Sequence, residues 1–444
     1  MRLLKFRSLD RTVNHDPGDR KIGIPSDSYP SLKRIPGIPK KGSSHPHPHP
    51  SMTKLMLWLA LFLYTRSAIM ALANPTYFPT ASPANNIITT VAGTGSGSYS
   101  GDGGSATSAT VNSPHGIVID SSGNVYISDD DNNRIRKITA STGIITTYVG
   151  TGTASYSGDG GLATSATLHG QNGLGIDNLG NIYIADQGNH CVRKVTVQSS
   201  IITTIAGTGS SGYNGDGIDA TSATMDYPVG VALDSSANFY ISDGFNNRIR
   251  NVFSSTGIIF TVAGTGVAGY SGDGGQATSA AIKLPVGINL DNSGNFYFGD
   301  DNGYNVIRKV TVATGIISTV AGTGSATGGY NGDNIAATSA TLYVPHDVVI
   351  DFFGNLYISD RNNNRVRKVT VSTGIITTVV GTGVTSSSGD GSAASSATVN
   401  WPVYSRFDSA GNLYVSEGAG DRVRKVLSFL PTIQPTSVPT FYPR

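Results

Sequence analysis

Short apolar runs separated by glycine and Asx turns fill the chain from residue 87 to about residue 430. In the first such unit the runs are Ile87–Ala92, Gly116–Asp120, Asn124–Ser128 and Arg134–Ile138, each of about five residues. Runs of this length with turn residues at both ends predict β-strands. The unit therefore predicts a small sheet of four antiparallel strands.

The same unit recurs six times along the chain. Its IITTVAGTG-type segment begins, with a period of 57 to 59 residues, at Ile87, Ile144, Ile201, Ile258, Ile316 and Ile375. A period of this size with four short strands per copy is typical of a radial array of small sheets. The predicted fold class is all-β, a six-bladed β-propeller with four antiparallel strands per blade.

The order of the strands predicts how the ring closes. Ile87–Ala92 precedes the other three strands of the first copy, and the last copy ends its strands with RVRKV at Arg422–Val426. The strand counts match only if the N-terminal strand completes the last blade. Such closure removes the exposed sheet edges that otherwise promote aggregation.

The blade sequence resembles the NHL repeat. The resemblance is carried by PHGIVIDSSGNVYISDDDNNRIRKI at Pro114–Ile138, with similar segments at Pro228–Val252, Pro345–Val369 and Pro402–Val426. The connecting GDGGSATSAT at Gly101–Thr110 is similar to the segments between blades in extracellular, teneurin-like NHL propellers. The resemblance implies the fold, but it says little about function, because this propeller hosts binding proteins, RNA readers and enzymes.

The segments before the repeat predict export. Residues 1–51 contain HPHPHP and no apolar period, and we expect a basic, disordered leader. Residues 52–73 combine Lys54, the apolar run Leu55–Tyr64 and an Ala-Leu-Ala cleavage motif, which is typical of a signal peptide. The alternative is a signal anchor, in which segment 55–72 stays in the membrane.

Both topologies place the propeller, residues 87–430, outside the cytosol. The expected location is therefore secreted or extracellular, or type II membrane-anchored. Residues 74–86 and 431–444 are rich in proline and threonine, and we expect an extended linker and tail on either side of the propeller.

Cysteine content and charge narrow the function classes. Cys191 is the only cysteine, so no internal disulfide forms, and we expect it to be a half-buried filler. The net charge is +2 overall, but from Asn74 onward 19 basic residues stand against 25 acidic ones. Most of these basic residues lie in the RIRKI-type strands, spread around the ring and matched by acids. We therefore expect no nucleic-acid partner.

Several repeated columns are expected to hold the framework together. An acid such as Asp129 ends the second strand and faces an arginine such as Arg136 in the third strand, which favours pairing across the hairpin. Acids such as Asp120 are expected to accept turn N–H groups, and tyrosines such as Tyr126 to pack between blades. The GDG aspartates, such as Asp102, are expected either to cap a short helical turn or to bind calcium.

Because the framework repeats, binding residues are sought where the copies differ. Length irregularities at Asn302–Asn305 and Ser325–Gly329 are expected on the face where the chain enters the inner strands, the default ligand surface. Aromatic residues and arginine are favoured at binding surfaces. The candidate ligand-binding residues are His115, Asn172, Phe245, Tyr304, His346, Arg361, Trp401, Tyr404 and Arg406.

Two of these candidates, His115 and His346, raise the question of zinc, since NHL-like amidating lyases place three histidines around their channel. The corresponding position in the third blade is Val229, and a catalytic zinc takes three protein ligands. We therefore expect rim histidines and no cofactor, with calcium or zinc as alternatives.

The predicted function is a non-catalytic binding scaffold for an extracellular protein or carbohydrate. No nucleophile elbow, histidine metal motif or phosphate loop is present in the sequence. The alternative is a propeller enzyme of amidating-lyase or gluconolactonase type with a metal at the channel mouth. The channel candidates, which include no acid outside the repeated columns, are His115, Asn172, Asn289, His346 and Arg406.

Overall fold

The computed structural model describes residues 86–301 and 303–427. The leader at 1–51, the signal-peptide segment at 52–73, nearly all of the linker and the tail at 431–444 lie outside the described residues. In the described ranges, no helix is long and apolar enough to cross a membrane.

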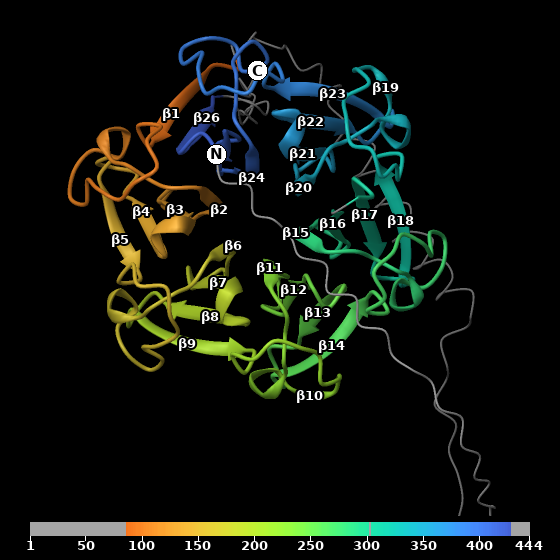
Figure 1. The fold of residues 1–444 in the computed structure, drawn as a ribbon, viewed down its shortest axis with the longest axis horizontal. Coiled ribbons are helices and arrows are strands. Elements are labelled where there is room, and N and C mark those ends of the chain that lie inside the picture. The colour runs from red at the N-terminus through yellow and green to blue at the C-terminus, as the bar shows by residue number, and fades with distance from the viewer. Residues whose placement is uncertain (1–85, 302, 428–444) are drawn as a thin grey trace, which may run out of the picture. The chain divides into compact units, whose positions relative to one another are not determined.

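Six antiparallel sheets form a ring, each a blade of four main strands, which confirms the predicted fold (Figure 1). The inner strands, nearest the centre, are β2 (Pro114–Ile119), β6 (Gln171–Ile176), β11 (Pro228–Leu233), β15 (Pro285–Leu290), β20 (Pro345–Ile350) and β24 (Pro402–Phe407). The second strands are β3 (Val125–Asp129), β7 (Ile182–Asp186), β12 (Phe239–Asp243), β16 (Phe296–Asp300), β21 (Leu356–Asp360) and β25 (Leu413–Glu417). The third strands are β4 (Arg134–Ile138), β8 (Cys191–Thr196), β13 (Arg248–Val252), β17 (Val306–Thr311), β22 (Arg365–Thr370) and β26 (Arg422–Val426).

The outer strands complete the blades, and the ring closes as predicted. They are β5 (Ile145–Val149), β9 (Ile201–Ala206), β14 (Ile258–Ala263), β18 (Ile316–Ala321), β23 (Ile375–Val380) and β1 (Ile88–Ala92). Strand β1 pairs with β26, with Ile88 opposite Val426, so the N-terminal strand finishes the sixth blade. Two short strands, β10 (Ile218–Asp219) and β19 (Ile335–Ala336), extend blades three and five.

The inner strands begin two residues earlier than the sequence suggested, at Pro114 in the first blade. Proline is tolerated there because it is the first residue of the strand and donates no ladder hydrogen bond. The register shifts between Pro114 and Ile117, so the strand is irregular at this end. At its other end Asp120 accepts hydrogen bonds from the backbone N–H groups of Ser122 and Asn124, both at 2.9 Å, as predicted.

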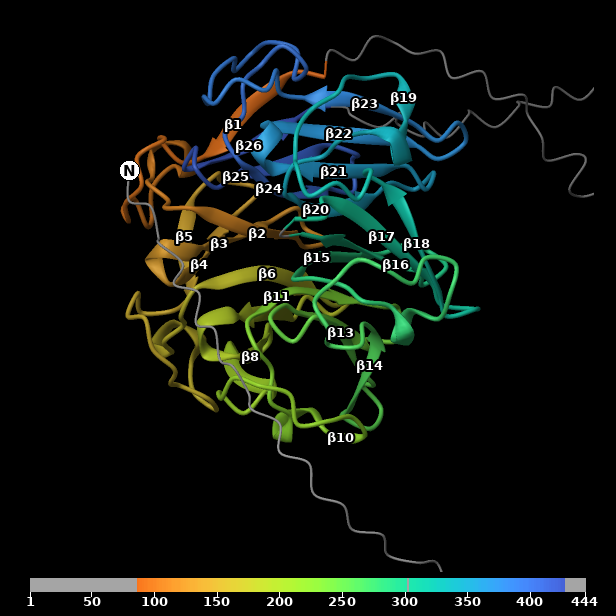
Figure 2. The ribbon, with the colours of Figure 1, turned by 45° about the vertical axis from the view of Figure 1, so that its right-hand side comes forward.

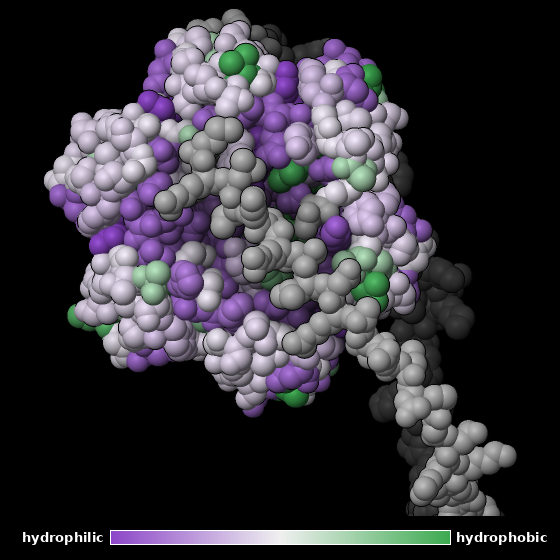
Figure 3. All heavy atoms as spheres, viewed as in Figure 1, coloured by the Kyte–Doolittle hydropathy of each residue, from purple (hydrophilic) through white to green (hydrophobic). Residues whose placement is uncertain are grey.

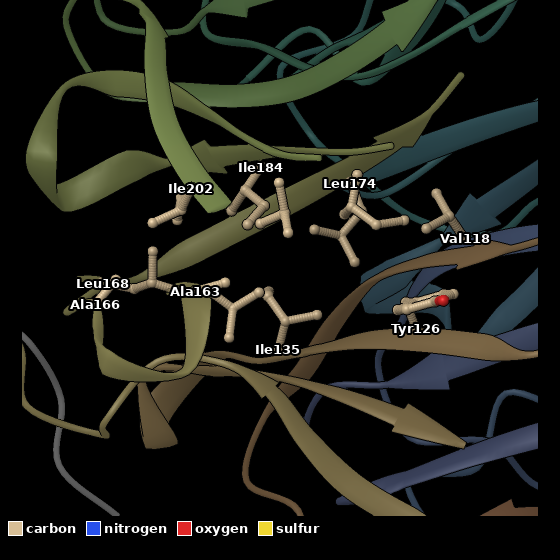
Figure 4. Packing of buried hydrophobic residues seen from close by; sticks show 12 residues of the cluster. Val118, Tyr126, Ile135, Ala163, Ala166, Leu168, Leu174, Ile184 and Ile202 are labelled. Carbon is tan, nitrogen blue, oxygen red and sulfur yellow. The ribbon is translucent and has the colours of Figure 1, made fainter. Parts of the chain in front are cut away.

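The blades lie side by side around the ring (Figure 2), and the hydrophobic core lies between neighbouring blades. Figure 4 shows Tyr126 and Ile135 of blade one facing Leu174 and Ile184 of blade two. This confirms the predicted packing role of the tyrosine column. Sheets that stack face to face in this way bury one side of each blade against the next.

The connecting segments add small 3₁₀ turns to this core, as their alanine spacing predicted. In blade one Ala106 and Ala109 are buried. The turns of this kind are η1 (Ala106–Ser108), η3 (Ala163–Ser165), η5 (Ala220–Ser222), η6 (Ala277–Ser279) and η7 (Ala337–Ser339). Three further turns join second to third strands: η2 (Asp130–Asn132), η4 (Gln187–Asn189) and η8 (Arg361–Asn363).

Each blade holds a buried arginine between two acids. Arg136 is fully buried, with Asp129 at 3.1 Å and the GDG aspartate Asp102 at 2.6 Å. The cross-strand pairing was predicted, but capping by the GDG aspartate was wrong, because η1 has no side-chain cap. The equivalent triads are Arg193 with Asp186 and Asp159, Arg250 with Asp243 and Asp216, Arg308 with Asp300 and Asp273, Arg367 with Asp360 and Asp333, and Arg424 with Glu417 and Asp390.

Two expectations about the third strands need correction. Cys191 is fully buried, not half-buried, and burial raises the pKa of its thiol. The arginines that begin the third strands, such as Arg134, contact carbonyls and aromatic rings, not acids. Arg134 donates to the carbonyl of Thr151 at 2.6 Å and lies 3.8 Å from the ring centre of Tyr99. These arginines are therefore also part of the framework.

Candidate functional site

One face of the ring carries both the turns after the second strands and the residues that lead into the inner strands; we call it the upper face. The side chain of Asn133, in one such turn, accepts a hydrogen bond from the backbone N–H of Gly170 in the next blade, at 3.2 Å. Equivalent bonds link the remaining pairs of blades, from Tyr227 to His190, Leu284 to Asn247, Val344 to Asn305, Trp401 to Asn364 and Ser113 to Asp421. These hydrogen bonds between blades were not predicted from the sequence.

The two length irregularities meet on the upper face. The side chain of Asn305, in the longer turn of blade four, donates to the carbonyl of Ser325 at 3.0 Å. The same side chain accepts the hydrogen bond from Val344 at 2.9 Å. The irregular loops therefore lie beside the chain entering inner strand β20.

The third residue of each inner strand faces the neighbouring inner strand, and it is glycine in four blades. A Cβ atom on Gly116 would lie 2.4 Å from the carbonyl oxygen of Asn172, so only glycine permits this approach. Blades five and six depart from the pattern with Asp347 and Tyr404.

Tyr404 crosses the centre of the ring. Its hydroxyl donates to the carbonyl of Val229, in blade three, at 3.3 Å, and its ring packs against His346 with centroids 5.2 Å apart. The side chain is buried, and Gly173 leaves the room that its hydroxyl occupies. Tyr404 therefore separates an upper part of the channel from a lower part.

Arg406 and Asn289 lie with the buried acid Asp347. Arg406 pairs with Asp347 at 2.7 Å, and the amide of Asn289 donates to the same carboxylate at 3.0 Å. Both residues also line a cavity of about 250 Å³ at the lower end of the inner strands. The expectation that the channel holds no acid outside the repeated columns is wrong, because Asp347 is such an acid.

Above Tyr404 the structure brings together His115, His346, Asp130 and Arg361, which we call the polar cluster. The ring centroids of the two histidines are 6.1 Å apart. Nδ1 of His115 lies 3.4 Å from Oδ2 of Asp130. Arg361 is close enough for its charge to act on both histidines.

Burial sets the charge of the polar cluster. Burial lowers the pKa of His115 to about 3, and the charge of Arg361 contributes. Burial, Arg361 and His115 likewise lower the pKa of His346. Burial raises the pKa of Asp130 to about 8, assisted by nearby carboxylates. At neutral pH the histidines are therefore uncharged and Asp130 carries a proton, which leaves Arg361 as the cation of the polar cluster.

Several buried polar atoms of the polar cluster have no hydrogen-bond partner in the described residues. They are Nδ1 of His115, Oδ1 of Asp130, Nδ1 of His346 and Nε of Arg361, joined at the same level of the inner strands by Oδ1 of Asn172. Buried polar groups in folded proteins are nearly always hydrogen-bonded. The polar cluster can therefore bind a polar group that the protein itself does not supply.

Two exposed stacks lie beside the polar cluster. The guanidinium of Arg361 lies 4.4 Å from the ring centre of Trp401, which is 40% exposed. Phe245, 51% exposed, stacks on Tyr227 at 4.5 Å, and Asp130 lies close enough to Tyr227 to help raise the pKa of its hydroxyl. Both stacks offer flat apolar surface next to buried polar groups.

The nine predicted residues thus divide into groups. His115, His346, Arg361, Trp401 and Tyr404 form one connected set, with Asn172 at the same level and Phe245 linked through Tyr227. Tyr304 instead stacks on Tyr270 at 5.4 Å, near Lys283, and Arg406 lies with Asp347. Figure 3 shows one face of the ring, with hydrophilic surface in the grooves between blades and small, separate hydrophobic patches.

Asp130 and Tyr227 were not among the residues predicted from the sequence. A signal was available in the position after the acid of the second strand, where the copies read Asp130, Gln187, Gly244, Asp301, Arg361 and Gly418. Alignment of that column would have shown charges that vary from blade to blade beside the histidines. Tyr227 occupies the same position in its blade as Trp401, and because this position varies among the copies it carried a signal as well.

The residues considered as metal ligands from the sequence have charged partners in the structure. Arg361 places a positive charge beside both histidines, and the third-blade position is Val229. Among residues 86–301 and 303–427, no three His, Cys, Asp or Glu side chains are grouped to hold a metal ion. The GDG carboxylates proposed for calcium are each bound by an arginine, as Asp102 is by Arg136.

A second exposed aromatic pair lies on the opposite, lower side of the ring. Phe352 and Phe353, 72% and 55% exposed, stand in the turn after β20, where most other copies have small polar residues. They line a groove of about 470 Å³ with Asp291, Asn292 and Ser293. No buried polar atom without a partner accompanies this pair among the described residues.

Comparison with known proteins supports the family. The model of the Teneurin NHL domain matches residues 84–157. Teneurin-4 of Homo sapiens is 29% identical over 282 residues, which is 55% of this chain and 10% of that protein. NHL repeat-containing protein 2 of Bos taurus is 22% identical, covering 60% of this chain and 40% of that protein.

Two further proteins are similar to this chain. Protein SUPPRESSOR OF QUENCHING 1, chloroplastic, of Arabidopsis thaliana is 26% identical over 61% of this chain and 26% of its own length. The chain thus spans less than half of each of these three relatives. A solved structure of unknown function from Bacteroides thetaiotaomicron has a TM-score of 0.58 at 21% identity, covering 76% of this chain and 75% of its own.

The blade sequence, the six four-stranded sheets and these matches agree with one another. The chain is a six-bladed β-propeller whose blades resemble NHL repeats, and its matches support a place among the NHL-repeat propellers.

Proposed function

We propose that the protein is a secreted or cell-surface binding scaffold that captures an extracellular protein or carbohydrate with its upper face, without catalysis. The observation that carries the proposal is the convergence of irregular residues from different blades. His115, His346, Arg361 and Trp401 come from blades one, five and six, yet they meet in one place. Repeated framework residues would not produce such a cluster.

The chemistry of the upper face supports binding. Aromatic and arginine side chains dominate the energetics of protein interfaces, and exposed aromatic rings also stack on sugars. The Trp401 and Phe245 stacks offer this type of surface on either side of polar groups. The signal-peptide pattern of residues 52–73 and the match to the Teneurin NHL domain support a location outside the cytosol.

The experiment that tests the proposal compares the two faces of the ring. Purified protein is applied to arrays of extracellular proteins and of glycans, beside an upper-face variant, Phe245→Ser with Trp401→Ser. The matched control is a lower-face variant, Phe352→Ser with Phe353→Ser. We expect the upper-face variant to lose binding to the captured partner, while the control retains it.

Loss of binding in the lower-face variant alone would place the interaction on the groove of Phe352 and Phe353 and contradict the proposal. Turnover of a lactone or an amidated peptide, abolished by His115→Ala, would instead assign the alternative enzymatic function. In both cases circular dichroism must show that the variants remain folded.

A further inference from the structure

The polar cluster differs from an ordinary protein interface because its key groups are buried. His346 is 4% exposed, its Nδ1 has no partner in the described residues, and it lies beside the buried ring of Tyr404. A flat partner surface cannot reach such a group. Only a narrow group that projects from a ligand can do so.

The charge of the polar cluster indicates which group fits. Arg361 contributes one positive charge, and its Nε has no hydrogen-bond partner among residues 86–301 and 303–427. Asp301 is close enough to act electrostatically on Arg361, so the surroundings hold no excess of positive charge. A single guanidinium near acidic residues matches a ligand group with one negative charge better than a phosphate with two.

The remaining groups are hydrogen-bonding groups without formal charge at neutral pH. The histidines stay neutral because of burial, and the raised pKa of Asp130 lets its carboxyl group donate a hydrogen bond. Hydrogen bonds between charged and neutral partners are stronger than those between neutral groups. Donors placed beside Arg361 therefore favour an anionic acceptor with two oxygens.

We propose that the polar cluster binds a carboxylate group of the ligand, which enters from the upper face between the Trp401 and Phe245 stacks and pairs with Arg361. The inference rests on the proposed function, since it names the chemistry of what the upper face captures. A free peptide C-terminus and an acidic sugar both supply this group. Arg361 provides the charge, His115 and His346 provide hydrogen bonds, and Tyr404 forms the floor.

The structure provides its own reporter for this binding. Trp58 and Trp401 are the two tryptophans of the chain, so a Trp58→Phe background leaves Trp401 as the only tryptophan. Its ring lies 4.4 Å from the guanidinium of Arg361. An anion paired with Arg361 should therefore change the emission of Trp401.

The experiment titrates the full chain with paired probes and follows Trp401 emission. One arm uses short peptides with free C-terminal carboxylates and the same peptides amidated. The other arm uses oligogalacturonate and its methyl ester. We expect a saturable change in Trp401 emission with the free acid of at least one arm and no change with its neutral partner. The arm that responds shows whether the carboxylate comes from a peptide or from a sugar. Inorganic phosphate should leave the emission unchanged.

Two arginine variants make the test specific. Arg361→Gln places in blade five the residue that blade two carries as Gln187, so the fold tolerates it. We expect the dissociation constant to rise by about tenfold or more, because a charged hydrogen bond is lost. The control is Arg365→Gln, a change at a column where blades two and four carry Cys191 and Val306; here we expect a change of less than about twofold.

Equal responses to acids and their neutral partners, equal affinity in Arg361→Gln, or no saturable response would overturn the carboxylate inference. If the protein and glycan arrays described above still show binding that depends on the upper face, the proposed function stands without the carboxylate inference. If the arrays fail as well, the upper face is not a binding surface.

Discussion

The most repeated residue-level feature is the arginine held between two acids in each blade. Arg136 also donates to the carbonyl of Ser100 at 3.1 Å, so it ties the connecting segment to the sheet. Its planar fork of donors suits this role, which lysine could not fill. Because Arg136 is fully buried, it stabilises the blade only when both acids are present. The loss of one acid leaves buried charge without a partner.

Removal of the acid in the second strand should therefore be costly. Asp129→Ala leaves Arg136 buried with only one carboxylate, and we expect a loss of about 3–5 kcal/mol in the free energy of unfolding, measured by urea denaturation. Asp219→Ala, at an exposed position, should change it by less than about 0.5 kcal/mol. Equal effects of the two substitutions would show that the triad does not stabilise the blade.

Residue-level charge also predicts how carboxylate binding depends on pH. The groups that face Asp130 are Asp129, Asp131, His115, Tyr227 and Tyr404. The pKa of Asp130 is raised to about 8, so its proton is present below that pH and is lost above it. The resulting anion repels a bound carboxylate.

We therefore expect carboxylate affinity, measured by Trp401 emission, to fall as the pH rises through about 8. Asp130→Asn removes the titrating group and should flatten this profile. A wild-type profile that is already flat between pH values on either side of 8 would show that Asp130 does not titrate there.

Among the strands, we expect β1 to matter most for the stability of the ring, because it closes the ring. It comes from the opposite end of the propeller sequence to its partner β26, and the backbone N–H of Leu427 donates to Ile87 at 2.9 Å. Without β1, the last blade would expose the edge of β26. Exposed edges of regular strands associate with other chains.

Deletion of residues 1–93 should therefore produce aggregation, whereas deletion of residues 1–79 should leave a monomer with an unchanged melting temperature. Size-exclusion chromatography with light scattering compares the two proteins. A monomeric, normally melting product of the longer deletion would mean that closure by β1 is not needed.

The strands and loops also show which structural features can be predicted from the sequence. Strand number, closure and the turn role of Asp120 were predictable because each follows from local pattern and counting. The GDG aspartate was misassigned because its arginine partner lies 34 residues away, on a strand to which the loop folds back. Tyr404 could not be placed, since its hydroxyl meets a carbonyl 175 residues distant across the ring. Patterns within one repeat carry no information about such contacts.

At the scale of the whole molecule, a regular ring presents irregular residues at one place. Framework columns use most charged residues of the blades in every copy, so they cannot distinguish one blade from another. The polar cluster draws on blades one and five, and its rim on blades three and six. The propeller fold thus brings together irregular residues that lie in different repeats of the sequence.

The proposed export is tested at the scale of the whole molecule as well. We expect the mature protein to begin near Asn74, after cleavage at Ala71-Leu72-Ala73, when the amino terminus of the secreted protein is sequenced. A cell-associated protein that still carries Leu55–Tyr64 would instead indicate the signal anchor.

We propose that the upper face, where the copies differ, is the binding surface. Hydrogen exchange of the protein with and without its captured ligand tests this most directly. We predict that protection rises in residues 225–246, 361–364 and 400–405, which carry the two stacks and Arg361. Protection confined to the lower turns at 291–293 and 351–354 would contradict the account.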